Sequence, residues 1–235
     1  MGSTAEFNPI KLVCGLLCGA MLLLLLPGVA QAQDQTVPAG VTDEELFGTM
    51  LRSSKWPTDF STASIPVCWE NPTYETAQYR LISRLAAENT WERSSKVRFS
   101  GWGPCGAHDL GIRIRIADEG PHTKALGKYL DGRPDGMVLN FTFHNWSPSC
   151  QNRREFCVYA IAAHEFGHAI GFTHEQNRPD APPECRAEAQ GSTGDYNVTK
   201  YDPYSIMNYC SPSWNGDGGL SKLDVDAVQT VYGKP

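Results

Sequence analysis

The sequence of 235 residues lacks any cluster of lysine or arginine, and its formal net charge at pH 7 is −6. Nucleic acids and anionic membrane surfaces bind to basic patches, so we expect neither as a partner. Internal repeats are also lacking, as are low-complexity segments outside the leucines near the start. With 41% hydrophobic and 20% charged residues, the composition is that of one globular domain with short appendages.

Long apolar runs are absent except for residues 12–26. Lys11 precedes this run, and Pro27, Gly28 and the small-residue pattern AQA at residues 30–32 follow it. The arrangement is typical of a secretory signal peptide that is cleaved after Ala32, and an uncleaved amino-terminal anchor is the alternative. We therefore expect residues 1–32 to be a signal peptide. The protein is then secreted, without stable membrane association after cleavage.

Cysteine is infrequent, with 8 residues, and two of them lie in the expected signal peptide. An even set in an exported protein indicates disulfides, here three. Sequence alone cannot choose among the pairings, although we favour Cys185 with Cys210 because both flank the motifs described below. The remaining candidates are Cys68, Cys105, Cys150 and Cys157.

Hydrophobic periodicity predicts an α+β fold. A helix is expected where Tyr79, Ile82 and Leu85 share one face with Ala86, and a second begins near Arg154. The expected strands are residues 65–69, 96–99, 112–116 and 136–146, with a short edge strand within 124–132. Residues 33–54 are polar, with one short helix expected at 43–51.

Three histidines and one glutamate stand close together in HEFGHAIGFTH, residues 164–174. His164 and His168 lie one helical turn apart, so their Cβ atoms are about 5–6 Å apart and both rings can bind one ion. His174 can join them only if the chain turns, and Gly171 permits this because glycine tolerates positive φ. Three neutral imidazoles with an open fourth position suit one catalytic Zn²⁺.

The alternative is that these are ordinary core or surface histidines. The five spaced positions match by chance in roughly one chain in 10⁵, which argues against it.

The string has the H-E-x-x-H-x-x-G-x-x-H signature of the metzincin zinc endopeptidases, which the sequence therefore resembles. SIMNY supplies the methionine of the metzincin turn at Met207. Within the metzincins the sequence is most similar to the astacin family, whose third histidine opens the string H-E-x-x-R-x-D, here residues 174–180. The final LSKLDVDAVQTVYG resembles the last helix of matrixins as much as that of astacins.

The resemblance implies a metzincin-type zincin catalytic domain. Its sheet is twisted and mostly parallel with an antiparallel edge strand; it has two long helices and a mostly irregular carboxyl-terminal subdomain that ends in a helix. It also implies zinc ligands His164, His168 and His174, the catalytic residue Glu165, and Met207 as the structural methionine. Tyr209 would be a catalytic tyrosine that binds the metal or the transition state, with a buried structural tyrosine as the alternative.

The expected domains are a signal peptide at 1–32, a short propeptide or amino-terminal arm at 33–55, and a metallopeptidase catalytic domain at 56–235. Two features depart from the astacin pattern. Residues 33–54 contain ELFGT without the zinc-binding aspartate of astacin prodomains, and Cys157 lacks its usual partner on the edge strand.

The implied function is a secreted zinc-dependent endopeptidase that hydrolyses internal peptide bonds through a zinc-activated water with a glutamate general base. Its partners would be protein or peptide substrates, which would lie antiparallel to an edge strand near residues 125–130. Two other functions remain open. One is a secreted binding protein that keeps zinc without catalysis, and the other is a zinc hydrolase of non-peptide amides.

Overall fold

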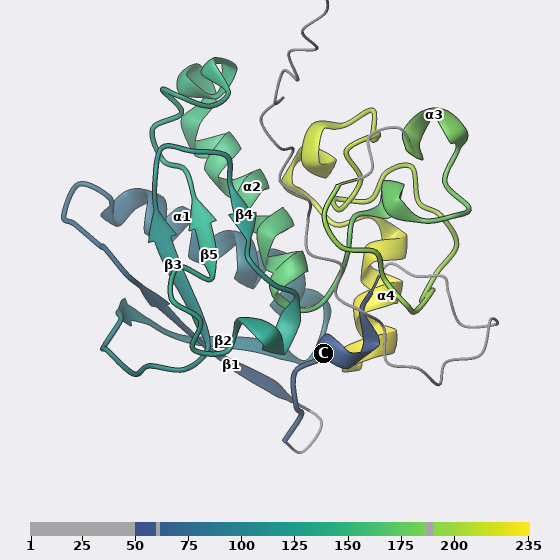
Figure 1. Cartoon of the computed structure of the whole chain (residues 1–235), viewed down its shortest axis with the longest axis horizontal. Coiled ribbons are helices and arrows are strands. Elements are labelled where there is room, and N and C mark those ends of the chain that lie inside the picture. Colours follow the sequence, from purple (N-terminus) through teal and green to yellow (C-terminus); the bar gives the residue numbers. More distant parts are fainter. Residues whose placement is uncertain (1–49, 60–61, 187–189) are drawn as a thin grey trace, which may run out of the picture. The chain divides into compact units, whose positions relative to one another are not determined.

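The computed structural model describes residues 50–59, 62–186 and 190–235. They form an α+β fold around one five-stranded sheet with the strand order β2-β1-β3-β5-β4 (Figure 1). Neighbouring strands are parallel except at the edge, where β4 runs antiparallel to β5. The strands are β1 (Ala63–Trp69), β2 (Val97–Pro104), β3 (Ile112–Ile116), β4 (His122–Thr123) and β5 (Met137–Leu139).

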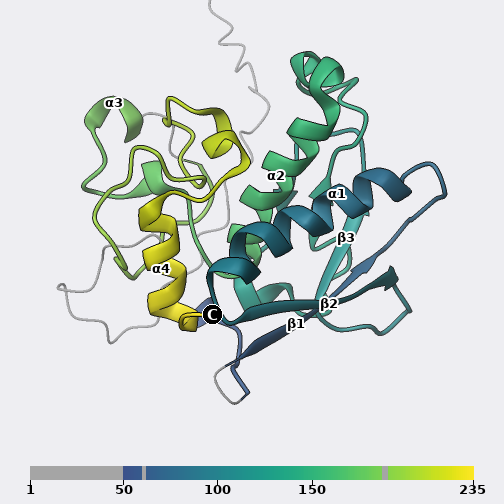
Figure 2. The ribbon, with the colours of Figure 1, turned by 180° about the vertical axis from the view of Figure 1, so that it is seen from behind.

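Two helices cover one face of the sheet (Figure 2). They are α1 (Ala77–Ala87), which continues into a π-helical turn at Glu88–Glu92, and α2 (Arg154–Ala169). The core lies between sheet and helices, and its largest fully buried apolar side chains include Trp69, Trp91, Ile112, Leu139 and Phe166. Because α2 is buried on nearly all sides from Cys157 onward, its position is set by packing along its whole length.

The charged residue Arg113 of β3 is buried, like its apolar neighbours in the same strand. Ile112 and Ile114 are buried, as their alternation predicts, and Arg113 between them is also buried. Its guanidinium forms two parallel hydrogen bonds with the Glu70 carboxylate, of 2.7 and 2.9 Å. Backbone oxygens of Gly106 and Asp109 accept from its Nη1 atom. The charge is therefore satisfied although it is removed from solvent.

Several expected elements are confirmed and others are wrong in place or length. The edge strand is His122–Thr123, whereas the expected region at 124–132 contains the 3₁₀ helix Gly127–Leu130. Gly127 has a φ of +50°, and a Cβ there would collide with the Ser54 backbone, so this segment turns against the amino-terminal arm instead of extending. The strand expected at 136–146 ends at Leu139. Leu85, assigned to the buried helix face, is 39% exposed.

After α2 the chain is mostly irregular. Residues 172–235 contain the one-turn helix α3 (Pro183–Arg186), short 3₁₀ helices at Glu175–Asn177 and Trp214–Gly218, and the final helix α4 (Lys222–Tyr232). Figure 1 shows this part on the side of α2 opposite the sheet. The predicted fold class is confirmed in its mostly parallel sheet, antiparallel edge, two long helices and irregular carboxyl-terminal part.

Three disulfides are present in the described part of the chain: Cys68–Cys105, Cys150–Cys157 and Cys185–Cys210. The third is the pairing that the sequence favoured. Cys150, shortly before α2, takes the place of the edge-strand cysteine that the sequence lacks. Among the described residues no helix is long and apolar enough to span a membrane. The expected signal peptide and the start of the helix expected at 43–51 lie outside those residues.

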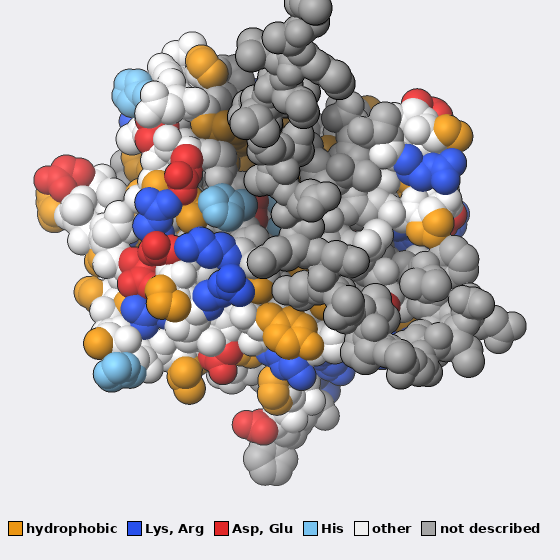
Figure 3. Space-filling view, in the orientation of Figure 1, with side chains coloured by type: hydrophobic (Ala, Val, Ile, Leu, Met, Phe, Trp, Pro, Cys, Tyr) orange, Lys and Arg blue, Asp and Glu red, His pale blue; other side chains and the backbone are white. Residues whose placement is uncertain are grey.

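Acidic and basic side chains lie next to one another on the described part of the face shown in Figure 3. Among the described residues, Arg115 and Lys124 also lie close to the carboxylate of Asp135, with N–O distances of 3.6 and 3.9 Å. Mixed charge of this kind stabilises little, because exposed ion pairs are screened by solvent.

Candidate metal centre

Each of the three motif histidines is oriented by a backbone carbonyl. The Nδ1 atom of His164 lies 2.7 Å from the Ile206 oxygen, that of His168 lies 2.8 Å from the Phe172 oxygen, and that of His174 lies 2.8 Å from the Gln190 oxygen. A carbonyl oxygen can only accept, so each ring carries its proton on Nδ1. Every Nε2 atom therefore presents a lone pair, which is the form that binds a metal.

These lone pairs converge. The Nε2 atom of His174 is 3.2 Å from that of His164 and 3.1 Å from that of His168. Two nitrogens bound at about 2.0–2.1 Å to one tetrahedral zinc would lie about 3.3 Å apart, so the spacing fits that ion. Burial lowers the pKa of His164 to about 3, which keeps the imidazole neutral. Within the described ranges, this is the one group of three or more potential ligands that could hold a metal.

The turn that brings His174 to the other two histidines is made at Gly171, which has a φ of +104° as predicted. A Cβ at this position would also lie only 2.6 Å from the Ser54 hydroxyl. Backbone hydrogen bonds from Gly171 to the His168 oxygen and from Phe172 to the Gly167 oxygen close the end of α2. Glycine is thus required both by the turn and by the close approach of the amino-terminal arm.

Glu165 lies beside the histidines with an unpaired oxygen. Its side chain is buried, and its Oε2 atom has no hydrogen-bond partner among the residues that the structure describes. Burial raises the pKa of its carboxyl to about 8 in the absence of a cation. An unpaired buried carboxylate oxygen is costly, and it needs a cation, a water or a substrate group as partner.

A pocket of about 80 Å³ opens at this carboxylate. One water needs only about 10–15 Å³, so the pocket has room for part of a substrate. Its lining joins His164, Glu165 and Tyr209 to Pro121, Trp146, Ile161, Trp214 and Asn215. No pattern in the sequence pointed to the two tryptophans and the proline, because they come from segments that only the fold brings to α2.

Tyr209 stands over the rings of two ligands. Its ring stacks on His164 with centroids 5.2 Å apart and planes 12° apart, and it lies 4.4 Å from the His174 ring. The side chain is 44% exposed, so it is not the buried structural tyrosine of the alternative. The backbone N–H of Tyr209 donates to the Gln176 side chain at 3.0 Å, which ties it to the segment after His174.

Met207 lies beneath the histidines, against the glycine between the first two of them on α2. A Cβ at Gly167 would overlap the Met207 sulfur and would lie 2.9 Å from the Trp91 ring. The Met207 carbonyl accepts from the backbone N–H of Glu175 at 2.9 Å. The methionine turn, residues 205–209, therefore contacts α2 between His164 and His168 and also braces the segment that follows His174.

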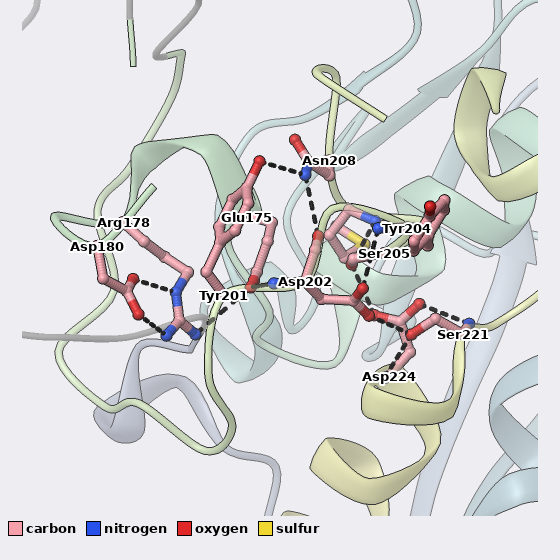
Figure 4. A network of polar contacts seen from close by, with 11 residues as sticks. Glu175, Arg178, Asp180, Tyr201, Asp202, Tyr204, Ser205, Asn208, Ser221 and Asp224 are labelled. Carbon is pink, nitrogen blue, oxygen red and sulfur yellow. Dashed lines mark hydrogen bonds and ion pairs between the residues drawn. The ribbon is translucent and has the colours of Figure 1, made fainter. Parts of the chain in front are cut away.

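The string H-E-x-x-R-x-D forms an ion-pair group around the buried Arg178, in the segment that follows His174 (Figure 4). Arg178 is 1% exposed and makes two hydrogen bonds to the Asp180 carboxylate, of 2.7 and 2.8 Å. Its Nη1 atom lies 3.4 Å from the Glu175 carboxylate. These residues hold the loop after His174 in place, and they do not line the pocket at Glu165.

Known proteins share both the motif region and the fold. The family model of the Astacin peptidase family matches residues 151–226. Interstitial collagenase of Bos taurus is 25% identical over 183 residues, which is 71% of this chain and 33% of that protein. This chain thus spans about a third of the length of that relative.

Two solved structures resemble the whole domain. Myroilysin aligns with a TM-score of 0.55 and 20% identity over 79% of this chain and 98% of its own. High choriolytic enzyme 1, a hatching enzyme zinc-protease from Oryzias latipes, aligns with a TM-score of 0.51 and 19% identity over 78% of this chain and 96% of its own. At these identities the structural likeness concerns the fold.

The fold and the triad of His164, His168 and His174 are similar to those of the catalytic domains of metzincin zinc metallopeptidases. Within that class the similarity is to the Astacin peptidase family, whose model covers α2, the methionine turn and the start of α4. The cofactor that the class and the three nitrogen donors specify is zinc.

Proposed function

We propose that this protein is a secreted endopeptidase that hydrolyses internal peptide bonds of proteins at the three-histidine zinc site, with Glu165 as general base. The observation that carries the proposal is the meeting of three imidazole lone pairs and one unpaired buried carboxylate at a single pocket. A structural zinc site is usually closed by four ligands, so three ligands beside an open pocket favour catalysis.

Zinc bound there would supply Lewis-acid activation of the scissile carbonyl and of the attacking water. Glu165 takes one proton from that water as the new C–O bond forms. It then gives the same proton to the leaving amine as the C–N bond breaks, so the carboxylate is regenerated. The Oε2 atom suits this role because no described residue competes for it.

For Tyr209 we propose a role in stabilising the transition state. Its ring lies over His164 and His174, and its side chain is exposed enough to change rotamer. From this position the hydroxyl can complete the metal shell at rest or donate to the oxyanion during hydrolysis.

An extended substrate would pair with β4, the last strand of the sheet, whose described residues hydrogen-bond to β5 on one side only. Pro121, which precedes β4, lines the same pocket as Glu165, so a strand added here would pass the carboxylate. This replaces residues 125–130 as the expected pairing segment, since 127–130 is a 3₁₀ helix.

Export agrees with the three disulfides, which form and persist in oxidising compartments. Residues 1–32 would direct it, as their sequence predicts. Processing after Ala32 would be visible as a new amino terminus by protein sequencing of the secreted form.

The deciding experiment is cleavage of an unfolded protein substrate by the secreted chain and by Glu165→Gln. The variant keeps the shape of the side chain but cannot accept the proton, so we expect cleavage to fall by at least about 10²-fold while one zinc remains bound. A chelator should abolish wild-type cleavage, and added zinc should restore it.

The same experiment separates the other functions. One outcome is that the chain binds zinc but cleaves nothing, even after the residues before Met50 have been removed. That outcome would favour a binding protein. Hydrolysis of small amides without cleavage of peptides would favour a non-peptide hydrolase. Equal activity of wild type and Glu165→Gln would remove Glu165 from the mechanism.

A further inference from the structure

Asp224, three residues into the amino-terminal end of α4, has a buried carboxylate that accepts three hydrogen bonds (Figure 4). The Ser205 hydroxyl donates to Oδ1 at 2.6 Å. The backbone N–H groups of Ile206 and Ser221 both donate to Oδ2 at 2.9 Å. One of these donors caps α4, but the other two belong to the methionine turn.

The methionine turn leads directly to a zinc ligand. In the peptide unit between Ile206 and Met207, the Ile206 carbonyl oxygen accepts a hydrogen bond from the Nδ1–H of His164, with an N–O distance of 2.7 Å. The N–H of the same peptide unit donates to the Ser205 hydroxyl at 3.0 Å. Because that hydroxyl in turn donates to Asp224, the carboxylate is connected to His164 through one hydroxyl and one peptide plane. Asp224 also holds the preceding peptide unit through Ile206 N–H.

A second series of hydrogen bonds connects the start of α4 with the residue that follows His174. The Ser221 hydroxyl donates to the Asp202 carboxylate, and the Asp202 N–H donates to the Glu175 carboxylate at 2.8 Å. Glu175 follows His174 directly in the chain. The Asp202 branch does not pass through the Asp224 carboxylate, so it would be kept when that carboxylate is removed.

We propose that Asp224 is a positioning residue of the metal centre, which acts on His164 through Ser205 and the peptide unit between Ile206 and Met207. The orientation of an imidazole ligand depends on the acceptor at its other nitrogen, and loss of such partners typically weakens metal binding by about 10–100-fold. If the peptide unit rotates, the His164 ring loses its acceptor and its lone pair leaves the common point. The proposal rests on the role of the histidines as zinc ligands and not on peptide cleavage.

The test compares zinc dissociation constants, measured by competition with a chromogenic chelator, for the full secreted chain and its variants. Asp224→Ala removes all three acceptor contacts and should weaken zinc binding by about 10–100-fold. Asp226→Asn is the matched control, because that carboxylate lies on the same helix but is exposed and pairs with Lys222. We expect its dissociation constant to stay within about twofold of wild type.

Two further variants separate positioning from stability. Asp224→Asn keeps an oxygen that can accept both N–H groups, and its amide can donate to the Ser205 oxygen, so it should recover most of the affinity. Ile114→Ala lowers stability through the sheet core without touching the turn. If Asp224→Ala binds zinc as tightly as Ile114→Ala at an equal loss of stability, the proposal is overturned.

The remaining outcomes are also decisive. Should Asp224→Ala not fold, Ser205→Ala cuts the hydroxyl link alone and must still weaken zinc binding for the proposal to hold. The wild type and its variants could show the predicted order of zinc affinities while the wild type cleaves no peptide. That result would contradict the endopeptidase function and leave the positioning role intact. A wild-type chain that binds no zinc overturns both.

Discussion

At the scale of single residues, the metal centre depends on close packing around a glycine next to the ligands. Gly167 lies between His164 and His168 on α2, where Met207 and Trp91 fill the space that a side chain would need. The motif string marks this position only as variable. The structure shows that the methionine turn can approach the helix because position 167 has no Cβ.

Gly167→Ala should therefore destabilise the protein, although alanine is normally better than glycine inside a helix by about 1 kcal/mol. The added methyl group would overlap the Met207 sulfur, and such overpacking typically costs about 1–3 kcal/mol. The measurement is urea unfolding of the zinc-loaded chain. Gly103→Ala is the control, since a Cβ there meets nothing within 4 Å. Equal stability of Gly167→Ala and wild type would show that Met207 can move aside.

Tyr209→Phe tests the hydroxyl of the tyrosine over the ligands. The ring stacking on His164 remains in the variant, so zinc affinity and KM should change little. If the hydroxyl donates to the oxyanion, kcat should fall by about 10²–10³-fold, the typical effect of removing one such donor. Steady-state kinetics on a quenched peptide measures both constants. An unchanged kcat would exclude Tyr209 from the chemistry.

At the scale of elements, the end of α2 is capped by the two ends of the described chain. The last carbonyls of a helix have no partners within it. Here Trp56 Nε1 donates to the Ala169 oxygen at 2.7 Å, the Tyr232 hydroxyl to the Ile170 oxygen at 2.7 Å, and Leu51 N–H to the Gly171 oxygen at 3.2 Å. The segment from Met50 to Trp56 and the helix α4 thus hold the turn that precedes His174.

We propose that residues 50–55 are a permanent arm of the catalytic domain rather than part of a removable propeptide. Met50 is 1% exposed, which agrees with a structural role. A chain that begins at Met50 should keep its zinc affinity and thermal stability, whereas one that begins at Trp56 loses the Met50 packing and the Leu51 hydrogen bond. We expect the second truncation to cost about 2–5 kcal/mol, as for loss of a large buried side chain. Calorimetry and zinc titration of both chains check this, and equal stability would argue that the arm is dispensable.

At the scale of the whole molecule, stability at acid pH depends on buried charge. The paired Arg113 guanidinium lowers the pKa of Glu70 below its usual value of 4.5. A lowered pKa means that the stabilisation is complete above about pH 4.5 and is lost as the pH falls through the folded-state value. Asp224 acts in the opposite sense, because burial raises its pKa to about 6, so its contribution declines as pH rises from about 4 to about 6.

Glu70→Gln isolates the first effect, since wild type and variant share Asp224. The variant should be less stable than wild type above pH 4.5, and the difference should shrink as the pH falls below it. Urea unfolding of the metal-free proteins across this range measures the difference without interference from zinc release. A difference that is constant with pH would mean that the Glu70 and Arg113 pair does not set the pKa of this carboxyl.

Much of the site was predictable because its chemistry is local in sequence. The spacing of His164 and His168 follows from the helical period, and the turn at Gly171 follows from its tolerance of positive φ. Helices and strands with strong periodicity were also predicted correctly, as for β3 and α2. Asp224 carried an overlooked signal, because Ser221 and Asp224 have the spacing of a capping box, which the structure confirms.

By itself, then, the sequence determined the three ligands, the adjacent carboxylate, the α+β class and the number of disulfides. Each of these depends on residue type and short spacing. Only the tertiary structure decided that the edge strand is His122–Thr123, that Arg113 is buried, and that Trp146 and Trp214 line the pocket at Glu165. It also decided which carbonyls orient the histidines, and that Asp224 accepts hydrogen bonds from the turn whose Ile206 carbonyl contacts His164. These contacts join segments far apart in the chain, and their energies arise only when the core places those segments together.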